Sequence, residues 1–555
     1  SDSYSYNLNA NLTLLFKIMK GLTLSVQGGY DYDNSPSYSF RSKLDSPGAI
    51  NSASNTNALH NYWQNTNNLT WQKQFGDHSF TAMGVWEISR SWDSQLKGTG
   101  SNLNNESVGY WNLGNAAIRD ASNSYTEFSL ASGIVRANYD YKKRYFITAA
   151  LRADGSSKFQ GDNKWGYFPS AAVAWDIAQE SFMSNQHVLD QLKLRASFGV
   201  TGNQDIAAYS TLGMLSGASY GWGTSTSSTG YWGYQFATPG ITWEKTYQYD
   251  LGLDMSIGGF NITVDWFKKQ TKDLLFQKQV PKYNGGGTYW VNQGKLNNTG
   301  VELSLTTFPV KGAVTWETSL NASYVKNDFV LTANYSDLGG PLQIMKPGYP
   351  MGSFYVYQWK GFDDKGANLY QKADGSLTTN PTSDDLVVKG QASPKWTVGW
   401  NNTVTWKNWT LNVFFNAATG YDRLNISRFM AASMTGVSRF ITLRDAYFKG
   451  WDHVANKADA LYPSLTNTDN KSYANSDFWL EDASFIKLKN ISLSYRIPRR
   501  VLKFASVQLS VSAQDLFTIT RYKGMDPEVY TSYDGLDYGA YPIPRTITFG
   551  AKIRF

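Results

Sequence analysis

The sequence predicts an all-β fold, in which the 555 residues form part of a transmembrane antiparallel β-barrel. Three observations lead to this prediction: apolar and polar residues alternate along most of the chain, tight links alternate with long ones, and the composition is aromatic but weakly charged. Aromatic residues make up 15% of the chain and charged residues 17%, which is unusual for a protein that water surrounds on every side. We therefore expect something other than water to contact much of the surface.

The alternation has a period of two residues, which is the period of a β-strand. In residues 547–555 the odd-numbered side chains are apolar, and the even-numbered ones are polar or glycine. Residues 260–266 repeat the pattern, with Phe260, Ile262, Val264 and Trp266 on the apolar face. We expect these apolar faces to point to lipid and the even-numbered residues of 547–555 to point to the lumen. A soluble β-sandwich also alternates in this way, so the alternation alone does not decide the fold.

The connections favour a barrel over a sandwich. Tight links alternate with long links along the chain. The tight links lie at 17–21, 75–77, 141–144, 258–259, 310–312, 407–408 and 498–503, and the long links at 42–60, 93–124, 201–242, 327–393, 421–479 and 519–543. Transmembrane barrels have short periplasmic turns at one end and long outer loops at the other. The connections of a β-sandwich are not expected to be short at one end and long at the other. About seventeen strands are predicted at 4–16, 22–40, 61–75, 78–92, 125–141, 145–153, 165–177, 191–200, 243–257, 260–276, 298–309, 313–326, 394–406, 409–420, 480–497, 504–518 and 544–555. The long link 327–393 is expected to hold an extramembrane hairpin.

The tight links are basic and have aromatic neighbours. The aromatic residues beside them are Phe16, Tyr141, Tyr145, Phe260, Phe308, Trp406 and Trp409. The basic residues in or next to them are Lys17, Lys20, Lys142, Lys143, Arg144, Lys311, Lys407, Arg499, Arg500 and Lys503. An aromatic girdle at the membrane interface and cations facing lipid headgroups would produce this arrangement. Membrane lipids are therefore expected partners.

The strand number predicts that part of the barrel lies outside this chain. Bacterial single-chain barrels have an even number of strands, with both ends on the periplasmic side. Seventeen is odd, and the chain opens at Ser1 without a methionine. We expect residues 1–555 to be the C-terminal part of the barrel, with the first strands upstream. A gap is then expected between strands 4–16 and 544–555.

Composition excludes several classes of protein. A net charge of +7 over this length is too mild for a nucleic-acid binder. The absence of cysteine removes disulfides and thiolate zinc sites, which suits a chain that crosses an oxidising periplasm. No apolar run reaches the roughly 18 residues that a membrane-spanning helix requires.

Specific segments resemble the SusC/RagA-like branch of the TonB-dependent transporters. The resemblance is carried by residues 151–159 (LRADGSSKF), 165–170 (WGYFPS), 192–204 (LKLRASFGVTGNQ), 243–246 (WEKT), 271–275 (TKDLL), 297–302 (NNTGVE), 482–491 (DASFIKLKNI) and 523–528 (KGMDPE). The terminal Phe555 also resembles the family's outer-membrane assembly signal.

The resemblance implies an outer-membrane location and a 22-stranded barrel, with an N-terminal plug outside this chain. It also implies a SusD-like surface lipoprotein as partner, and contact with the TonB complex through the missing N-terminal region. The implied function is import of oligosaccharide or peptide nutrients. Without a plug and a coupling segment, residues 1–555 are not expected to carry out energised transport by themselves.

No catalytic site, metal site or cofactor is predicted. The histidines, expected in turns and loops, lack metal-ligand spacing: His60, His78, His187 and His453. Residues 217–221 match the G-x-S-x-G nucleophile motif, but no helical pattern follows them. The acidic patches lack the spacing of a calcium loop and are interpreted as hydrated loop residues: Asp363 with Asp364, Asp384 with Asp385, and Asp534 with Asp537. An outer-membrane enzyme would need a Ser/His or Asp/His constellation, so we do not expect an enzyme.

The candidate contact residues for a ligand or partner are Trp222, Tyr231, Trp232 and Tyr234, in the predicted loop 201–242. Aromatic rings stack on the C–H faces of sugars and anchor apolar groups of peptides; packing of the loop against itself is the alternative interpretation. Loops 201–242, 327–393 and 421–479 are expected on one side, where a capping lipoprotein would dock. Two functions stay open from sequence: nutrient import, and a SusC-like barrel that serves as a structural docking subunit of a larger outer-membrane complex.

Overall fold

The computed structural model describes residues 1–45, 48–222, 226–330, 338–339, 342–432, 443–465, 470–498, 500–501, 505–528 and 535–554. The side chain of Trp222, and Arg499, Lys503, Asp534 and Phe555, lie outside the described residues. The chain divides into two compact units. Unit 1 comprises Ser1–Trp175, Ala196–Gln248 and Thr271–Gln293, and unit 2 comprises Asp176–Arg195, Tyr249–Gln270 and Gly294–Phe555. Among the described residues, no helix is both long enough and apolar enough to span a membrane.

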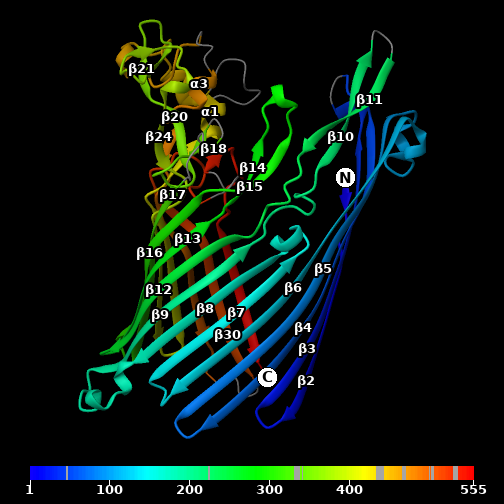
Figure 1. Cartoon of the computed structure of the whole chain (residues 1–555). Helices are drawn as coiled ribbons and strands as arrows, with labels where there is room; N and C mark the ends of the chain where they lie inside the picture. Colours follow the sequence, from blue (N-terminus) through cyan, green and yellow to red (C-terminus); the bar gives the residue numbers. More distant parts are fainter. Residues whose placement is uncertain are drawn as a thin grey trace. The chain divides into compact units, whose positions relative to one another are not determined.

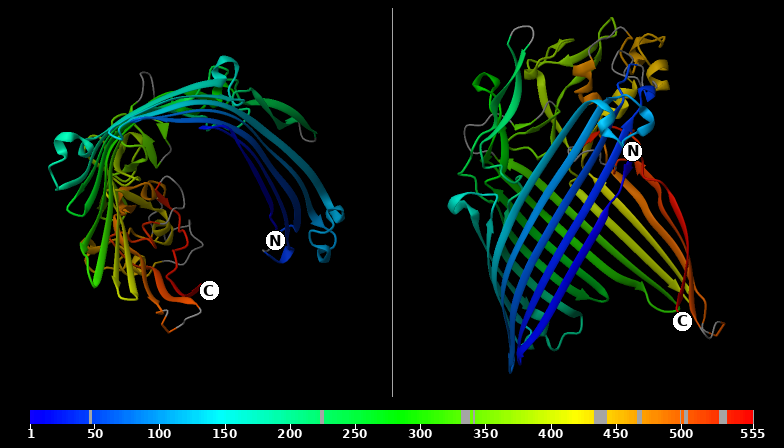
Figure 2. Two further views of the ribbon diagram at one scale, coloured as in Figure 1. Left: turned by 90° about the horizontal axis from the view of Figure 1, so that it is seen from below. Right: turned by 90° about the vertical axis from the view of Figure 1, so that its right-hand side faces the viewer.

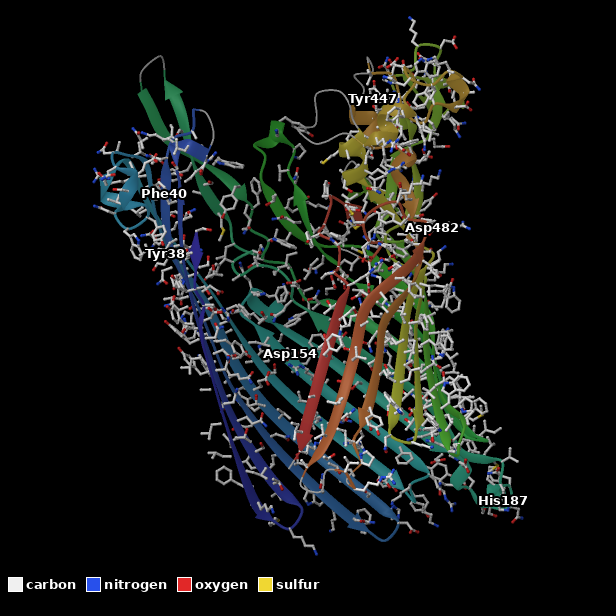
Figure 3. All side chains as sticks on the ribbon, turned by 180° about the vertical axis from the view of Figure 1, so that it is seen from behind. Tyr38, Phe40, Asp154, His187, Tyr447 and Asp482 are labelled. Carbon is white, nitrogen blue, oxygen red and sulfur yellow. The ribbon has the colours of Figure 1, made fainter. Side chains whose placement is uncertain are left out.

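Unit 1 is built on an antiparallel ladder whose strands pair in chain order, side by side in Figures 1 and 2. These strands are β2 (Tyr6–Met19), β3 (Leu22–Arg41), β4 (Ser52–Phe75), β5 (His78–Leu103), β6 (Ala116–Tyr141), β7 (Tyr145–Ser156) and β8 (Trp165–Asp176). The short strand β1 (Asp2–Ser3) pairs with the outer part of β3, close to Tyr38, which Figure 3 labels. The turns β2–β3, β4–β5 and β6–β7 lie at one end of the ladder. A glycine is required at Gly21, because its φ is +82° and a Cβ there would meet the carbonyl oxygen of Gln72 at 2.2 Å.

Two of the predicted long loops in unit 1 contain the ends of strands. β4 begins at Ser52 and β5 continues to Leu103, so Ser52 still pairs with Ser101, and β6 begins at Ala116. The predicted loops 42–60 and 93–124 were too long because these strand ends carry mostly polar residues. Their backbone hydrogen bonds continue where the apolar alternation that marked the strands has stopped. A small core of Ala53, Leu103 and Ala116 closes this outer end.

Unit 2 contains a second antiparallel ladder. Its strands pair in the order β16 (Lys295–Val310), β17 (Val314–Val330), β25 (Trp396–Trp406), β26 (Trp409–Thr419), β29 (Phe485–Arg496), β30 (Ser506–Thr520) and β32 (Thr546–Arg554). Three further strands contribute residues to both units: β9 (Leu189–Asn203), β12 (Glu244–Ile257) and β13 (Phe260–Lys272). Each of the seventeen predicted ranges overlaps one of the strands in these two paragraphs. The predicted strand 260–276 is too long, because Asp273, at a φ of +56°, follows the end of β13.

The register of β32 agrees with the predicted faces. Phe549 pairs with Val511 and Ile553 with Val507, so apolar side chains share one face, while Lys552 pairs with Gln508 on the other. Every side chain of β2 and of β32 is exposed, as is typical of a strand at the edge of a ladder.

The outer loops of unit 2 fold into small sheets and short helices around an apolar core. The sheets are β18 (Leu338–Gly339), β19 (Gln343–Met345), β20 (Ser353–Tyr357) and β24 (Leu386–Gln391); β21 (Trp359–Phe362), β22 (Asn368–Gln371) and β23 (Leu377–Thr378); and β28 (Leu480–Asp482), β27 (Asp422–Asn425) and β31 (Leu536–Asp537). The helices are α1 (Ile426–Ala432), α2 (Arg444–Phe448) and α3 (Asn470–Ala474). Phe354, Leu424, Phe429 and Trp479 are buried at the centre. A hairpin was expected within 327–393, and the antiparallel pairs β19–β20 and β21–β22 lie there.

Candidate functional site

All four predicted contact residues lie on one β-hairpin of unit 1. The hairpin consists of β10 (Met214–Trp222) and β11 (Thr226–Gln235), and it belongs to a four-stranded sheet with β15 (Thr288–Asn292) and β14 (Leu275–Gln279). Trp222 is the last residue of β10 and pairs with Thr226. Tyr231, Trp232 and Tyr234 lie on β11, which Figure 1 labels beside β10. The predicted loop 201–242 thus contains a regular hairpin.

The structure brings two of these side chains together and separates a third. Trp232 and Tyr234 are two residues apart and share one face of β11, with their ring centroids 6.5 Å apart. Phe236 follows the end of β11, beyond a shift in the pairing register at Tyr234, and the rings of Trp232, Tyr234 and Phe236 are all exposed, at 43%, 37% and 41%. Tyr231 points to the opposite face. We call Trp232, Tyr234 and Phe236 the aromatic row; Phe236 was not predicted, although its i+2 spacing could have indicated it.

The base of β11 is fixed by a buried glutamine. The side-chain amide of Gln235 donates to the carbonyl oxygens of Tyr209 at 3.1 Å and Leu212 at 2.8 Å. The amide of Gln160 donates to the carbonyl oxygen of Thr211 at 3.0 Å. Since Gln235 is 9% exposed, these bonds are shielded from water and hold the hairpin to the segment below it.

Close backbone packing positions the neighbouring strands. Gly287 has a φ of +93°, and a Cβ there would lie 2.7 Å from the carbonyl oxygen of Gly233 and 3.0 Å from the ring of Phe236. The backbone N–H of Phe236 donates to the carbonyl oxygen of Thr288 at 2.8 Å. Glycine at 287 therefore lets the segment before β15 approach the aromatic row.

The hairpin carries no charge. No Asp, Glu, Lys, Arg or His occurs between Asp205 and Glu244. A cation lies on β14, where burial lowers the pKa of Lys278 and its ammonium nitrogen lies 5.9 Å from the ring centroid of Tyr289. The exposed surface of β11 can therefore contact a ligand through ring stacking and hydroxyl groups, without ion pairs.

A second polar centre, in unit 2, was not predicted. The Nζ of Lys487 lies 2.9 Å from Asp526 Oδ2 and 2.7 Å from Glu528 Oε2, and the lysine side chain is 1% exposed. Arg423 Nε donates to the carbonyl oxygen of Pro527 at 2.7 Å, and the hydroxyl of Tyr421 donates to the same oxygen at 3.1 Å. We call this the Lys487 anchor, because it fixes segment 521–528 to β29 and to the outer loops of unit 2.

The anchor joins two of the segments that carry the family resemblance, 482–491 and 523–528. Burial by itself would raise the pKa of Glu528. Hydrogen bonds and positive charge from Lys487 and Lys489 outweigh that effect, so the pKa of Glu528 is lowered. The carboxylate is therefore ionised at neutral pH and paired with both ammonium groups.

Two of the predicted turn histidines lie in strands instead. His60 is inside β4, where its Nδ1 lies 2.7 Å from Asp93 Oδ1 on β5, and His78 is the first residue of β5. The turn prediction failed for them because β4 extends outward and the β4–β5 turn is only two residues long. His187, labelled in Figure 3, and His453 lie outside helices and strands.

In two of the predicted acidic patches, a carboxylate accepts hydrogen bonds from the backbone. Asp363 Oδ1 accepts from the backbone N–H of Ala367 at 2.8 Å, and Asp385 Oδ1 accepts from that of Ala373 at 3.0 Å. The hydrogen bond from the backbone N–H of Thr382 is the largest cause of the lowered pKa of Asp385. Among the residues that the structure describes, no group of three or more His, Cys, Asp or Glu residues could hold a metal ion.

Comparison with known proteins identifies the family. Residues 1–516 match the family model described as TonB dependent receptor-like, beta-barrel. The chain belongs to this family. TonB-dependent receptors of the SusC and RagA kind are outer-membrane proteins that cross the membrane through β-strands, and at the level of the family they are receptors rather than enzymes.

Relatives within the family are much longer than this chain. TonB-dependent receptor P3 of Formosa agariphila is 31% identical, over 100% of this chain and 58% of its own length. TonB-dependent receptor SusC of Bacteroides thetaiotaomicron is 30% identical, over 79% of this chain and 45% of its own length. The chain thus spans about half the length of the curated relatives it matches.

A solved structure of the RagAB peptide transporter has the same fold. Its matched chain has a TM-score of 0.87 and 23% identity, over 99% of this chain and 62% of the transporter chain. The same transporter in its open-open state gives a TM-score of 0.88 over 100% of this chain.

Proposed function

We propose that residues 1–555 are barrel strands and outer loops of an importer that takes up oligosaccharide or peptide nutrients across the outer membrane. In this proposal a SusD-like surface lipoprotein delivers the nutrient, and the TonB complex supplies energy through a region upstream of these residues. The family supports import in general, and the relatives include SusC and the RagAB peptide transporter. The exposed edges of β2 and β32 are where we expect the remaining barrel strands to pair.

The observation that carries the proposal is the aromatic row on an uncharged hairpin. Trp232, Tyr234 and Phe236 present three exposed rings within five residues, on a strand pair rich in serine, threonine and glycine. Sugars stack on such rings through their C–H faces, and peptides insert apolar side chains between them. Aromatic surface of this extent in a water-exposed loop is expected to bind a ligand or a partner protein.

A second surface of this chain, in unit 2, is a candidate contact site for the lipoprotein. Tyr447 and Phe448 of α2 are 46% and 59% exposed, and their rings pack edge to face at 5.2 Å. Tyr447 is labelled on the outer loops of unit 2 in Figure 3. Rigid aromatic side chains of this kind concentrate binding energy at interfaces.

The test compares a double variant and a single variant whose substitutions lie on opposite faces of β11. In the full-length protein, Trp232→Ser with Tyr234→Ser should reduce uptake of fluorescent oligosaccharides or a fluorescent peptide mixture, whereas Tyr231→Ser should leave uptake unchanged. Deleting 221–236 should abolish uptake or weaken co-purification of the lipoprotein, with the barrel still resistant to heat on a gel. If the deletion alters neither uptake nor lipoprotein retention, the hairpin is not the contact site. Loss of lipoprotein retention in a protein that transports nothing would favour the structural docking subunit.

A further inference from the structure

A cluster of aromatic rings lies at the outer end of unit 1, where three separate segments of the chain meet. Tyr38 of β3 is at its centre. Its ring stacks on those of Tyr110 and Trp111, with centroids 5.4 and 6.0 Å apart, and Tyr4 packs against it edge to face at 6.4 Å. Asp2 pairs with Tyr38 in the β1–β3 ladder, and its carboxylate accepts a hydrogen bond from the hydroxyl of Tyr110. We call these residues the Tyr38 cluster.

The Tyr38 cluster lies on the face of the sheet that we expect to contact lipid, but beyond the membrane. β3 pairs with β4 without a register shift, so Tyr38 shares a face with Leu24, which pairs with Phe16 and Leu69. β3 has 20 residues, about twice the roughly 9–11 that cross a membrane. Tyr38 is near the outer end of this strand, where Figure 3 labels it. The cluster therefore faces away from the lumen, past the hydrocarbon of the membrane.

The loop that carries two rings of the cluster is fixed at its start by a hydrogen-bond network. The carboxylate of Glu106 accepts from the hydroxyl of Ser42 at 2.8 Å and from the backbone N–H of Lys43 at 3.0 Å. It also accepts from the side-chain amide of Asn51 at 2.9 Å. Asn51 is fully buried and exchanges two hydrogen bonds with the backbone of Leu103, at 2.6 and 3.0 Å. Because the loop is ordered before anything binds, a ligand of the cluster does not have to order it.

The exposed part of the cluster is small and has a carboxylate beside it. Trp111 is 78% exposed and Tyr4 is 53% exposed, whereas Tyr38 and Tyr110 are partly buried. Two exposed rings present far less than the roughly 800 Å² per partner of a stable protein interface. An indole face does match the size of one pyranose ring, whose C–H groups stack on it. The exposed carboxylate of Asp2 can accept hydrogen bonds from sugar hydroxyls and would repel an acidic sugar.

We propose that the Tyr38 cluster binds a neutral pyranose sugar of the glucose type, with a C–H face of the sugar on Trp111 and its hydroxyls donating to Asp2. Two sources share this chemistry: a polysaccharide outside the cell, and the glycan chains of the cell's own lipopolysaccharide, which surround the barrel at this height. In either case the sugar is held outside the lumen, so the cluster retains a glycan at the cell surface without passing it through the barrel. This site is separate from the aromatic row and independent of the proposed import function.

The test uses full-length protein that carries Trp232→Ser and Tyr234→Ser, so that the aromatic row does not contribute; we call it the parent. Saturation-transfer NMR titrations measure binding of cellohexaose, maltohexaose and laminarihexaose in one arm, and of neutral glycan fragments of the host's lipopolysaccharide in the other. At least one arm should show binding, and the arm that binds identifies the source. Adding Trp111→Ala should weaken this binding about ten-fold or more, whereas Trp111→Phe, which keeps a ring, should weaken it about three-fold or less.

Two further variants separate the ring from the charge. Asp2→Asn should reduce the preference for neutral sugars over hexagalacturonate, because it removes the repulsion between carboxylates. Leu96→Ala is the matched control and should leave binding unchanged: Leu96 is 62% exposed and shares this face of the sheet through Asn57 and Pro36, but it is not part of the cluster. Heat resistance on a gel checks that each variant has folded. The proposal is overturned if neither arm shows binding, if Trp111→Ala binds as well as the parent, if Leu96→Ala weakens binding as much as Trp111→Ala, or if the parent binds hexagalacturonate as tightly as the neutral sugars.

Discussion

Lys487, which is buried, and Glu528 form an ion pair, with 2.7 Å between Nζ and Oε2, although they are far apart in the sequence. The lysine side chain is 1% exposed, and Asp526 provides a second carboxylate at 2.9 Å. A buried ammonium group is tolerated in protein when it is paired and hydrogen-bonded in this way. The pair therefore determines where the segment after β30 lies.

Lys487→Met should release segment 521–528 from β29. The change leaves Asp526 and Glu528 close together without their cation, and we expect the free energy of local opening to fall by about 3 kcal/mol. Hydrogen exchange of the amides of 521–528 measures this. Lys489→Met is the control, because Lys489 is 32% exposed and also bonds to Glu528, at 3.2 Å. Its effect should be about 1 kcal/mol or less, and equal effects in both variants would contradict a special role for the buried lysine.

Acid should detach the same segment. The folded-state pKa of Glu528 lies below its ordinary value of 4.5, so the stabilisation is fully present above about pH 4.5 and is lost as pH falls through the lowered folded-state value. The chain has no cysteine, so Met525→Cys, at a position that is 77% exposed, provides a unique site for a spin label. Label mobility should rise in acid, and Glu528→Gln should give high mobility already at neutral pH. A mobility that does not change between pH 7 and the point of global unfolding would refute the prediction.

Gln235→Leu should loosen the aromatic hairpin at its base. The carbonyl oxygens of Tyr209 and Leu212 would lose a donor that is shielded from water, at a cost of roughly 1–3 kcal/mol. We expect faster hydrogen exchange in 214–235. Gln277→Leu removes an amide that donates at 3.1 Å to Thr288 Oγ1 in an exposed position, and it should change exchange in the hairpin little.

Gly287→Ala should push β14 and β15 away from the aromatic row. Its Cβ would meet the carbonyl oxygen of Gly233 at 2.7 Å, in addition to the strain of a positive φ. Gly285 also has a positive φ, of +95°, but its Cβ would meet nothing within 4 Å. Gly285→Ala therefore reports the strain alone, at about 1 kcal/mol. Thermal unfolding of the two variants should differ; identical melting temperatures would show that the close contact does not matter.

The strands were predictable where one face is apolar. β12, β26 and β32 begin and end close to their predicted positions, because two different environments impose the alternation on the residues themselves. The outer ends of β4, β5 and β6 were missed because most of their residues are polar, so the alternation of apolar and polar residues that marks a strand is weak there.

The candidate site was predicted in part. Aromatic composition pointed to Tyr231, Trp232 and Tyr234, but only the register of β11 separates Tyr231 from the other two. The Lys487 anchor was not predicted, because a single sequence does not show which carboxylates meet a lysine. Complementary charge was the available signal: Lys487 and Lys489 lie in one resemblance segment, and Asp526 and Glu528 in another.

The absence of charge between Asp205 and Glu244 also determines how the hairpin responds to its surroundings. Salt weakens attraction between ions by screening them, and pH acts through groups that gain or lose protons; the side chains of β10 and β11 offer neither ions nor groups that titrate near neutrality. A nutrient held on these rings would be held as firmly in brackish water as in fresh water, and as firmly in a slightly acidic medium as in a slightly alkaline one.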